Sequence, residues 1–253
     1  MKKLKFLAFA LFTVFACVSF ASCSDDDKDE PEMPSPLVQK RLVKFSINAG
    51  SYEITYDSQG RIVAVVYYGY DGQTDRTTTY TYSSSQISAT ETYSSGDSYM
   101  EIYHLNNGLI TEQGDITYSY EGGRISKWRD MSGSNKTFEW SNGDISGTST
   151  NWSDGYDCGD AAYKYTDKYD YGRIVGIIED SDDLLYDDFD PYLVMQGFFG
   201  TTPLNLPQDA SNTWGNTYAY TYEFDEDGYP ISGTRYINGR KIDSLSFFWE
   251  KCD

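Results

Sequence analysis

The chain is poor in the side chains from which most catalytic and metal sites are built. Its 253 residues include a single histidine, His104, and four cysteines. A nucleophile activated by histidine therefore has only one centre available. His104 stands just before an Asn-Asn-Gly turn, which is typical of a surface position at a strand end. The counts also argue against a zinc site of histidine and cysteine ligands. We therefore predict no catalytic residue, no cofactor and no enzymatic activity.

Basic side chains are scarce as well. The chain has 20 lysines and arginines against 39 acids, a net charge of −19. Residues 1–36 hold six of the acids and four of the bases, so the chain from Leu37 onward carries a net charge of −17. This charge argues against binding to nucleic acid or to anionic membrane surfaces. Cations, basic proteins and neutral glycans remain as partners, and the charge favours a soluble monomer.

Only one long apolar run is present, and it lies at the N-terminus. Lys2, Lys3 and Lys5 precede the apolar residues 6–20, and small residues follow, as in a cleaved signal peptide. Residues 20–23, Phe-Ala-Ser-Cys, resemble a bacterial lipobox, in which the cysteine becomes the lipidated first residue of the mature protein. We therefore expect a signal peptide over residues 1–22 and a lipid anchor on Cys23. Cys17 is the rival, but further apolar residues follow it.

The residues after Cys23 are acidic and then rich in proline. Asp25, Asp26 and Asp27 open this stretch, and it ends at Pro36. Such a composition stays solvated and extended, which predicts a tether over residues 23–36. Its place directly after the lipidated cysteine resembles the export signal of Bacteroides-type lipoproteins that are displayed on the cell surface. A plain solvated spacer is the alternative. The ordered domain is expected over residues 37–253.

Within that domain one short pattern recurs. The segment 56–62 reads YDSQGRI, and variants lie at 120–125, 140–145 and 169–174, with a looser copy at 224–231. An aromatic residue ends a strand, Asp or Asn bonds its own backbone, glycine supplies the positive φ of the turn, and isoleucine starts the next strand. The pattern predicts a series of β-hairpins.

The remaining composition favours strands. Aromatic residues make up 17% of the chain, with 24 tyrosines, and no segment after residue 36 shows a long helical period. Tyrosines alternate with threonine and glutamate, which indicates an antiparallel sheet with one wet face. We predict an all-β fold, a meander of about 13 to 16 strands. Accumulated twist would curl it into a half-barrel or cup. One short helical insertion is expected near 188–199, with Asp190 as N-cap and Pro191 in the first turn.

The repeats, the helical insertion and the aromatic-rich segment 218–230 resemble a domain-of-unknown-function family of Bacteroides-type outer-membrane lipoproteins with a porin-like fold. The resemblance covers most of residues 45–250. It implies a curved antiparallel sheet and no established activity. A membrane-spanning barrel is not expected, because the alternation of Tyr with Thr and Glu provides no continuous apolar band facing lipid.

Few residues are candidates for a site. Trp152 and Trp214 lie in polar loops and could stack on a ligand. Asp154, Asp157 and Asp160 form a weak calcium candidate, with solvated loop acids as the alternative. Cys158 and Cys252 either form a disulfide or remain as two separate thiols.

These features suggest a surface-displayed, non-catalytic outer-membrane lipoprotein that binds an extracellular glycan or peptide. A structural or assembly component of the envelope that recruits protein partners is the alternative. A hydrolase is the third class, and it would require a cleft that holds a carboxylate of raised pKa.

The lipid anchor is tested by metabolic labelling with a clickable fatty acid. We expect the protein to be labelled, and Cys23→Ser to abolish the label because the acylated thiol is lost. Cys17→Ser is the matched control and should leave labelling intact. Label that persists in Cys23→Ser would contradict the anchor.

Overall fold

The computed structural model describes residues 33–36, 38–48, 50–153, 157–178 and 189–252, with the backbone alone for 157–159. Sixteen strands and two short helices make up this part of the chain. The strands are β1 (Lys40–Ile47), β2 (Gly50–Tyr56), β3 (Ile62–Tyr68), β4 (Thr74–Tyr82), β5 (Gln86–Tyr93), β6 (Ser98–Asn106), β7 (Leu109–Gln113), β8 (Ile116–Glu121), β9 (Arg124–Arg129), β10 (Asn135–Ser141), β11 (Asp144–Asn151), β12 (Asp157–Tyr169), β13 (Asn205–Asn212), β14 (Thr217–Phe224), β15 (Pro230–Ile237) and β16 (Arg240–Lys251), and the helices are α1 (Val175–Ile178) and α2 (Pro191–Met195).

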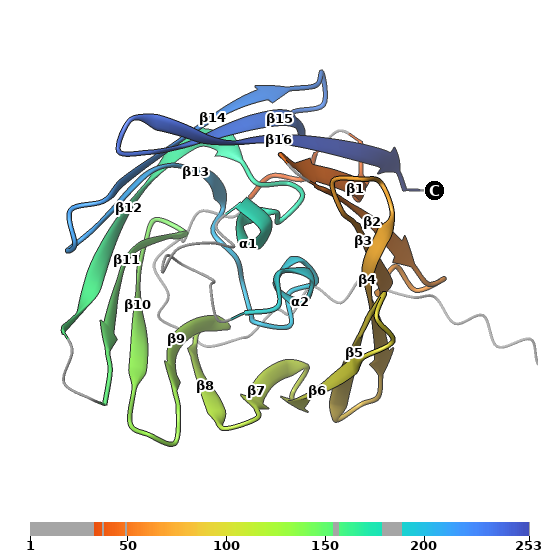
Figure 1. The fold of residues 1–253 in the computed structure, drawn as a ribbon. Coiled ribbons are helices and arrows are strands. Elements are labelled where there is room, and N and C mark those ends of the chain that lie inside the picture. The colour runs from red at the N-terminus through yellow and green to blue at the C-terminus, as the bar shows by residue number, and fades with distance from the viewer. Residues whose placement is uncertain (1–32, 37, 49, 154–156, 179–188, 253) are drawn as a thin grey trace, which may run out of the picture. The chain divides into compact units, whose positions relative to one another are not determined.

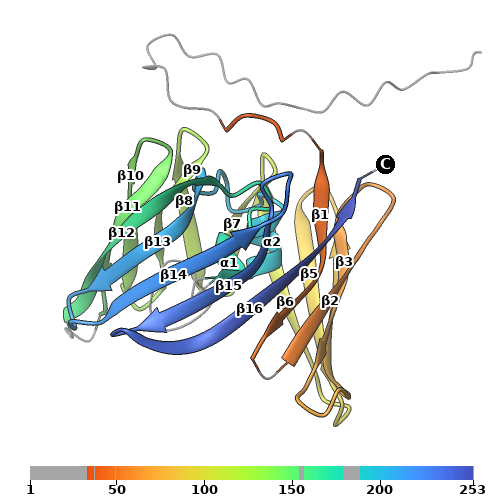
Figure 2. The same ribbon diagram turned by 90° about the horizontal axis from the view of Figure 1, so that it is seen from above.

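The sheet closes on itself. Each strand pairs with its neighbour in the chain, and β16 pairs antiparallel with β1, from Lys40 opposite Lys251 to Ile47 opposite Leu245 (Figure 1). The expected half-barrel or cup is therefore wrong, although the all-β class and the number of strands are confirmed. Closure removes both sheet edges, whose unpaired N–H and C=O groups would otherwise be exposed. Figure 2 shows β1 and β16 side by side.

Successive turns lie at alternate ends of this up-and-down barrel. One end of the barrel is called here the repeat end, because the recurring pattern forms most of its turns. It holds the turns β2–β3, β4–β5, β6–β7, β8–β9, β10–β11 and β14–β15. The opposite end is called the distal end. It holds the turns β3–β4, β5–β6, β7–β8, β9–β10, β13–β14 and β15–β16. The chain enters β1 and leaves β16 at the repeat end.

Six isoleucines that follow turns at the repeat end point into the barrel, whereas Ile231 after the β14–β15 turn is 43% exposed. At most 1% of the surface of each of the six is exposed, and the set is Ile62, Ile87, Ile110, Ile125, Ile145 and Ile174. On β4, Thr79 and Thr81 are exposed, while Tyr80 between them is buried. On this strand the apolar side faces the interior and the polar side faces outward, which is the reverse of a strand that faces lipid. Within the described residues, no helix combines the length and hydropathy needed to cross a membrane.

Six aromatic side chains tie neighbouring strands together near the repeat end, and we call these contacts the aromatic clamps. Each donates a hydrogen bond from its ring N–H or hydroxyl to a backbone carbonyl on the preceding strand. The pairs are Tyr56 to Leu42 (2.6 Å), Tyr82 to Ile62 (2.5 Å), Tyr120 to Ile110 (2.5 Å), Trp140 to Ile125 (2.8 Å), Tyr222 to Pro207 (2.9 Å) and Trp249 to Pro230 (2.6 Å).

The arginine of the repeat packs on the same clamps. The guanidinium of Arg61 lies 4.7 Å from the ring centroid of Tyr82, and that of Arg124 lies 5.1 Å from Trp140. Each such cation–π contact contributes about 0.5 to 1 kcal/mol at a partly exposed site. The recurring Gly-Arg-Ile thus supplies a turn, a cation for the next aromatic ring, and an acceptor for that ring's hydrogen bond.

One copy of the repeat does not form a hairpin. After Tyr169 the chain turns inward, and Ile174 leads into α1 rather than into a strand. The prediction that segment 169–174 restarts a strand is therefore wrong, because Asp170 caps the turn that leads into α1 instead of closing a hairpin. The predicted helix near 188–199 is confirmed in place but is shorter, since α2 ends at Met195 and Gly197 takes a positive φ of 79°.

Both helices lie inside the barrel (Figure 1), and backbone hydrogen bonds hold this insertion to the repeat-end turns. The N–H of Ile110 donates to the Phe198 carbonyl at 2.8 Å, and that of Thr201 donates to the Gly123 carbonyl at 2.9 Å. Gly200, at a φ of 88°, lies so close to the Gly123 carbonyl oxygen that a Cβ there would clash with it. The described parts of the insertion therefore pack inside the barrel and bond to its repeat-end turns.

Asp170 fixes both ends of this insertion. Its buried carboxylate accepts hydrogen bonds from the N–H groups of Ile174 (3.0 Å) and Val175 (2.9 Å). Its own N–H donates to the carbonyl of Leu204, where the insertion ends (2.8 Å). Burial raises the pKa of Asp170 to about 7, against the opposing effect of these donors.

We expect this carboxyl to make the free energy of unfolding fall as the pH rises from about 4 to about 7. The folded-state pKa of about 7 exceeds the ordinary 3.8. The stability from Asp170 is therefore complete below the ordinary pKa and is lost as the pH rises through the folded one. Relative to Asp170→Asn, the native protein should lose about 2 to 4 kcal/mol over this range in urea unfolding followed by fluorescence. Asp115→Asn, at an exposed turn position, is the control, and native and Asp170→Asn proteins with parallel pH profiles would contradict the assignment.

Candidate ligand-binding site

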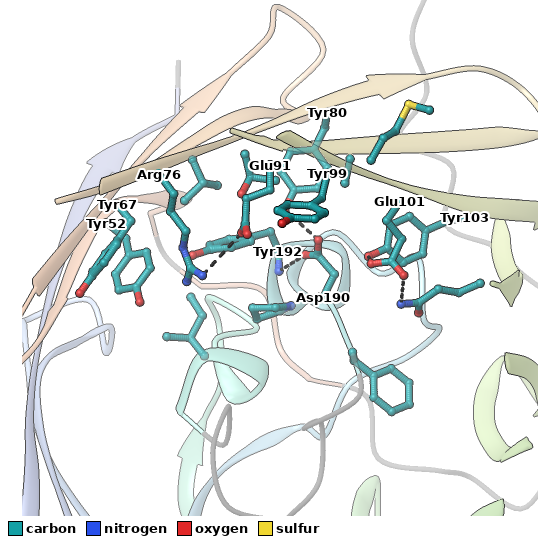
Figure 3. A pocket seen from close by; sticks show the side chains of 18 of the residues that line it. Tyr52, Tyr67, Arg76, Tyr80, Glu91, Tyr99, Glu101, Tyr103, Asp190 and Tyr192 are labelled. Atoms are coloured by element: carbon teal, nitrogen blue, oxygen red, sulfur yellow. Dashed lines mark hydrogen bonds and ion pairs between the residues drawn. The ribbon is translucent and has the colours of Figure 1, made fainter. Parts of the chain in front are cut away.

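A cavity of about 680 Å³ opens inside the distal half of the barrel. Its walls are the inward faces of β1 to β8, and the start of α2 with Phe189 and Asp190 forms its floor. We call it the distal cavity. Its tyrosine and charged lining residues, labelled in Figure 3, are Tyr52, Tyr67, Arg76, Tyr80, Glu91, Tyr99, Glu101, Tyr103, Asp190 and Tyr192.

One side of the distal cavity is aromatic and neutral in charge. Tyr52 stacks on Phe45 with ring centroids 4.4 Å apart and lies 4.7 Å from Tyr67. The guanidinium of Arg76 lies 5.3 Å from the Tyr67 ring and pairs with Glu91 at 3.6 Å. This side presents flat rings beside an internally compensated ion pair.

The other side is acidic. Asp190 accepts a hydrogen bond from the Tyr80 hydroxyl (2.8 Å) and caps α2 through the N–H groups of Tyr192 (2.9 Å) and Leu193 (3.1 Å). Glu101 accepts from Tyr103 at 3.1 Å and from Gln113 at 2.8 Å. Hydroxyl and amide donors therefore hold both carboxylates in place without neutralising them.

The pKa values on this side follow from burial and from like charge. Burial raises the pKa of Asp190 to about 6, against the hydrogen bond from Tyr80, and the negative charge of Glu101 adds to the rise. Burial also raises the pKa of Tyr103 well above its usual range, with Asp190 and Glu101 contributing. The tyrosine therefore stays protonated and acts as a hydrogen-bond donor at neutral pH.

A second cavity, of about 390 Å³, lies at the repeat end. Three of its cations are already paired with acids: Lys40 contacts Asp225 and Asp227, both at 2.6 Å, Arg41 contacts Glu250 at 3.0 Å, and Arg61 contacts Asp57 at 2.7 Å. The pairs of Lys40 and Arg41 join the start of the barrel to its last hairpins, and that of Arg61 lies within the β2–β3 turn. We therefore interpret this cavity as part of the closure of the barrel.

The two predicted tryptophans are exposed but do not line the distal cavity. Trp152 follows β11 with 38% of its surface exposed and packs 6.1 Å from Trp128. Trp214 lies in the β13–β14 turn with 52% exposed. Both lie at the distal end, in connections between strands that do not form the cavity.

The other predicted site residues lie largely outside the described residues. Asp154 and the side chain of Asp157 are among these, and Asp160 is exposed. No group of three or more metal-ligating side chains forms in the part of the chain that the structure describes. Cys252 is free and exposed, and the side chain of Cys158 is not described. The calcium site and the disulfide stay predictions. His104 is exposed on β6.

The charged lining of the distal cavity was missed in the sequence, although a signal for it exists. Strand residues two apart face the same side of a sheet. Arg76 therefore shares the inward face of β4 with Tyr80, and Glu91 shares that of β5 with Ile87. A charged residue that shares a strand face with a buried apolar residue therefore indicates a polar site inside the barrel.

Comparisons with known proteins identify the fold. No protein-family model and no curated protein matches the chain. Among solved structures, a porin-like protein from Bacteroides uniformis matches with a TM-score of 0.61 and 17% identity, over 86% of this chain and 99% of that one. A porin-like protein from Bacteroides vulgatus matches with a TM-score of 0.57 and 13% identity, over 84% and 99%. The chain therefore shares the antiparallel barrel fold of these porin-like proteins.

Proposed function

We propose that the protein is a surface-displayed outer-membrane lipoprotein that binds an extracellular glycan, without catalysis, in the distal cavity. The observation that carries this proposal is a cavity of about 680 Å³ lined by tyrosines and a few fixed polar groups. Its volume is within the range of about 300 to 1,000 Å³ that is typical of small-ligand sites. Tyrosine suits a sugar because its ring has an apolar face and its hydroxyl forms hydrogen bonds.

The direction of the barrel supports display of this cavity. The chain enters β1 at the repeat end, whereas the cavity lies in the distal half. A tether from a lipidated Cys23 would therefore join the barrel at the end away from the ligand. The likeness to Bacteroides porin-like proteins is consistent with this setting.

A glycoside hydrolase is the second candidate function, because Asp190 is a carboxylate of raised pKa in a cavity. A general acid must be free to give its proton to the substrate. Both oxygens of Asp190 are instead used by Tyr80 and by the first turn of α2. These contacts make Asp190 a helix cap and favour binding without catalysis.

An assembly role that recruits protein partners has less support. Phe248 and Ile242 are exposed on the outer face of β16, at 50% and 38%. They are six residues apart along the strand, which separates them by about 20 Å. Single exposed apolar residues are common on protein surfaces. The distal cavity is therefore the better-supported site.

Tyr99 offers a direct test of the proposed function. It lines the distal cavity and is 67% exposed, so its removal should leave the barrel stable. We expect Tyr99→Ala to weaken binding of a glycan identified by array screening by about fivefold to tenfold, as expected for the loss of one aromatic contact.

The matched control is Tyr70→Ala, at the same end, 89% exposed and outside the cavity lining. Calorimetry with the purified full-length variants makes the comparison. Equal affinity of both variants for the glycan would contradict binding in the distal cavity.

A further inference from the structure

The distal cavity carries an uncompensated negative charge on one side. Its described lining contains four charged side chains, Arg76, Glu91, Glu101 and Asp190. Arg76 and Glu91 pair with each other at 3.6 Å. No lysine or arginine in the described part of the chain forms an ion pair with Glu101 or Asp190. Two carboxylates therefore face the cavity with hydroxyl, amide and backbone N–H donors alone.

These two carboxylates act on the same region of the cavity. Figure 3 shows Asp190 on the floor and Glu101 on the wall, with the ring of Tyr99 between the strands and the floor. Both carboxylates line the same cavity. Tyr103 lies beside Glu101 and bonds to it.

We propose that the ligand is an amino sugar whose protonated amine binds between Glu101 and Asp190. This inference rests on the proposed glycan binding and specifies its chemistry. An ammonium group supplies the positive charge that both carboxylates lack. The exposed ring of Tyr99, which also lines the cavity, offers cation–π attraction to the same group.

The rest of the cavity suits the neutral part of such a ligand. Tyr52 and Tyr67 present rings on the opposite side, beside the compensated pair of Arg76 and Glu91. A pyranose ring can pack on these faces while its amine reaches the acidic side. The net charge of the domain favours the approach of cations over anions, so an acidic sugar is the least suitable ligand.

The experiment compares two ligands that differ only in charge. A glucosamine trimer with free amines and its N-acetylated counterpart are titrated into the full-length protein by calorimetry at low salt. We expect the free-amine trimer to bind about tenfold more tightly, because only it carries positive charge. Added salt should reduce this difference.

The variant Glu101→Gln keeps the side-chain shape and removes the charge. It should weaken binding of the free-amine trimer by about tenfold and leave the N-acetylated trimer unchanged. Glu112→Gln, the same substitution at an exposed position on the neighbouring strand β7, is the matched control and should change neither affinity. Equal loss for both trimers in Glu101→Gln would overturn the charge assignment.

The outcomes separate this inference from the proposed function. Equal affinity of native protein for the two trimers, with both weakened by Tyr99→Ala, would overturn the amine preference and leave glycan binding in place. No binding of either trimer would overturn the amino-sugar assignment, and a glycan array without any ligand would then remove the proposed function as well. If a lysine tripeptide bound the protein and the glucosamine trimer did not, the assignment of the ligand as a sugar would be overturned in favour of a basic peptide.

Discussion

The hydrogen bond from an aromatic side chain to the carbonyl of the preceding strand is the contact on which this fold depends. It recurs six times near one end of the barrel, from Tyr56 to Trp249. Each clamp joins two hairpins that neighbouring turns alone would leave free to splay. The net contribution of one such bond is about 1 kcal/mol, so the set is comparable with the whole stability of a typical domain, about 5 to 15 kcal/mol. The clamps therefore hold neighbouring strands together at the repeat end, where the chain both enters and leaves the barrel.

The insertion bonds to the turns at the repeat end of the barrel, and the candidate site lies in the distal half. Its backbone bonds reach the turns at Gly123 and Gly143. The first residues of α2 form the floor of the distal cavity, so Asp190 has two roles. It caps the helix that fills the barrel, and it supplies negative charge to the cavity above. The candidate site therefore exists because the barrel is filled from one end only.

The sequence predicts local structure well here because each repeat contains its own turn chemistry. The strand class, the number of strands and the helix start at Asp190 follow from neighbouring residues. Closure does not, because it depends on the width set by all sixteen strands together. The copy at 169–174 has the same local signals as the hairpins, yet the burial of Asp170 directs it inward. Arg76, Glu91 and Glu101 become a site only when separate strands bring them together, which the alternation on any one strand does not reveal.

The most direct test of this account is the free energy of unfolding of Tyr120→Phe, which removes one clamp hydroxyl and nothing else. Tyr236→Phe, on the outer face of β15, is the control, since Tyr236 makes no clamp. Urea unfolding should show a loss of about 1 to 2 kcal/mol in Tyr120→Phe, because the buried Ile110 carbonyl loses its partner. The control should change by less than about 0.5 kcal/mol. Equal, small changes in both variants would contradict the claim that the clamps hold the barrel together.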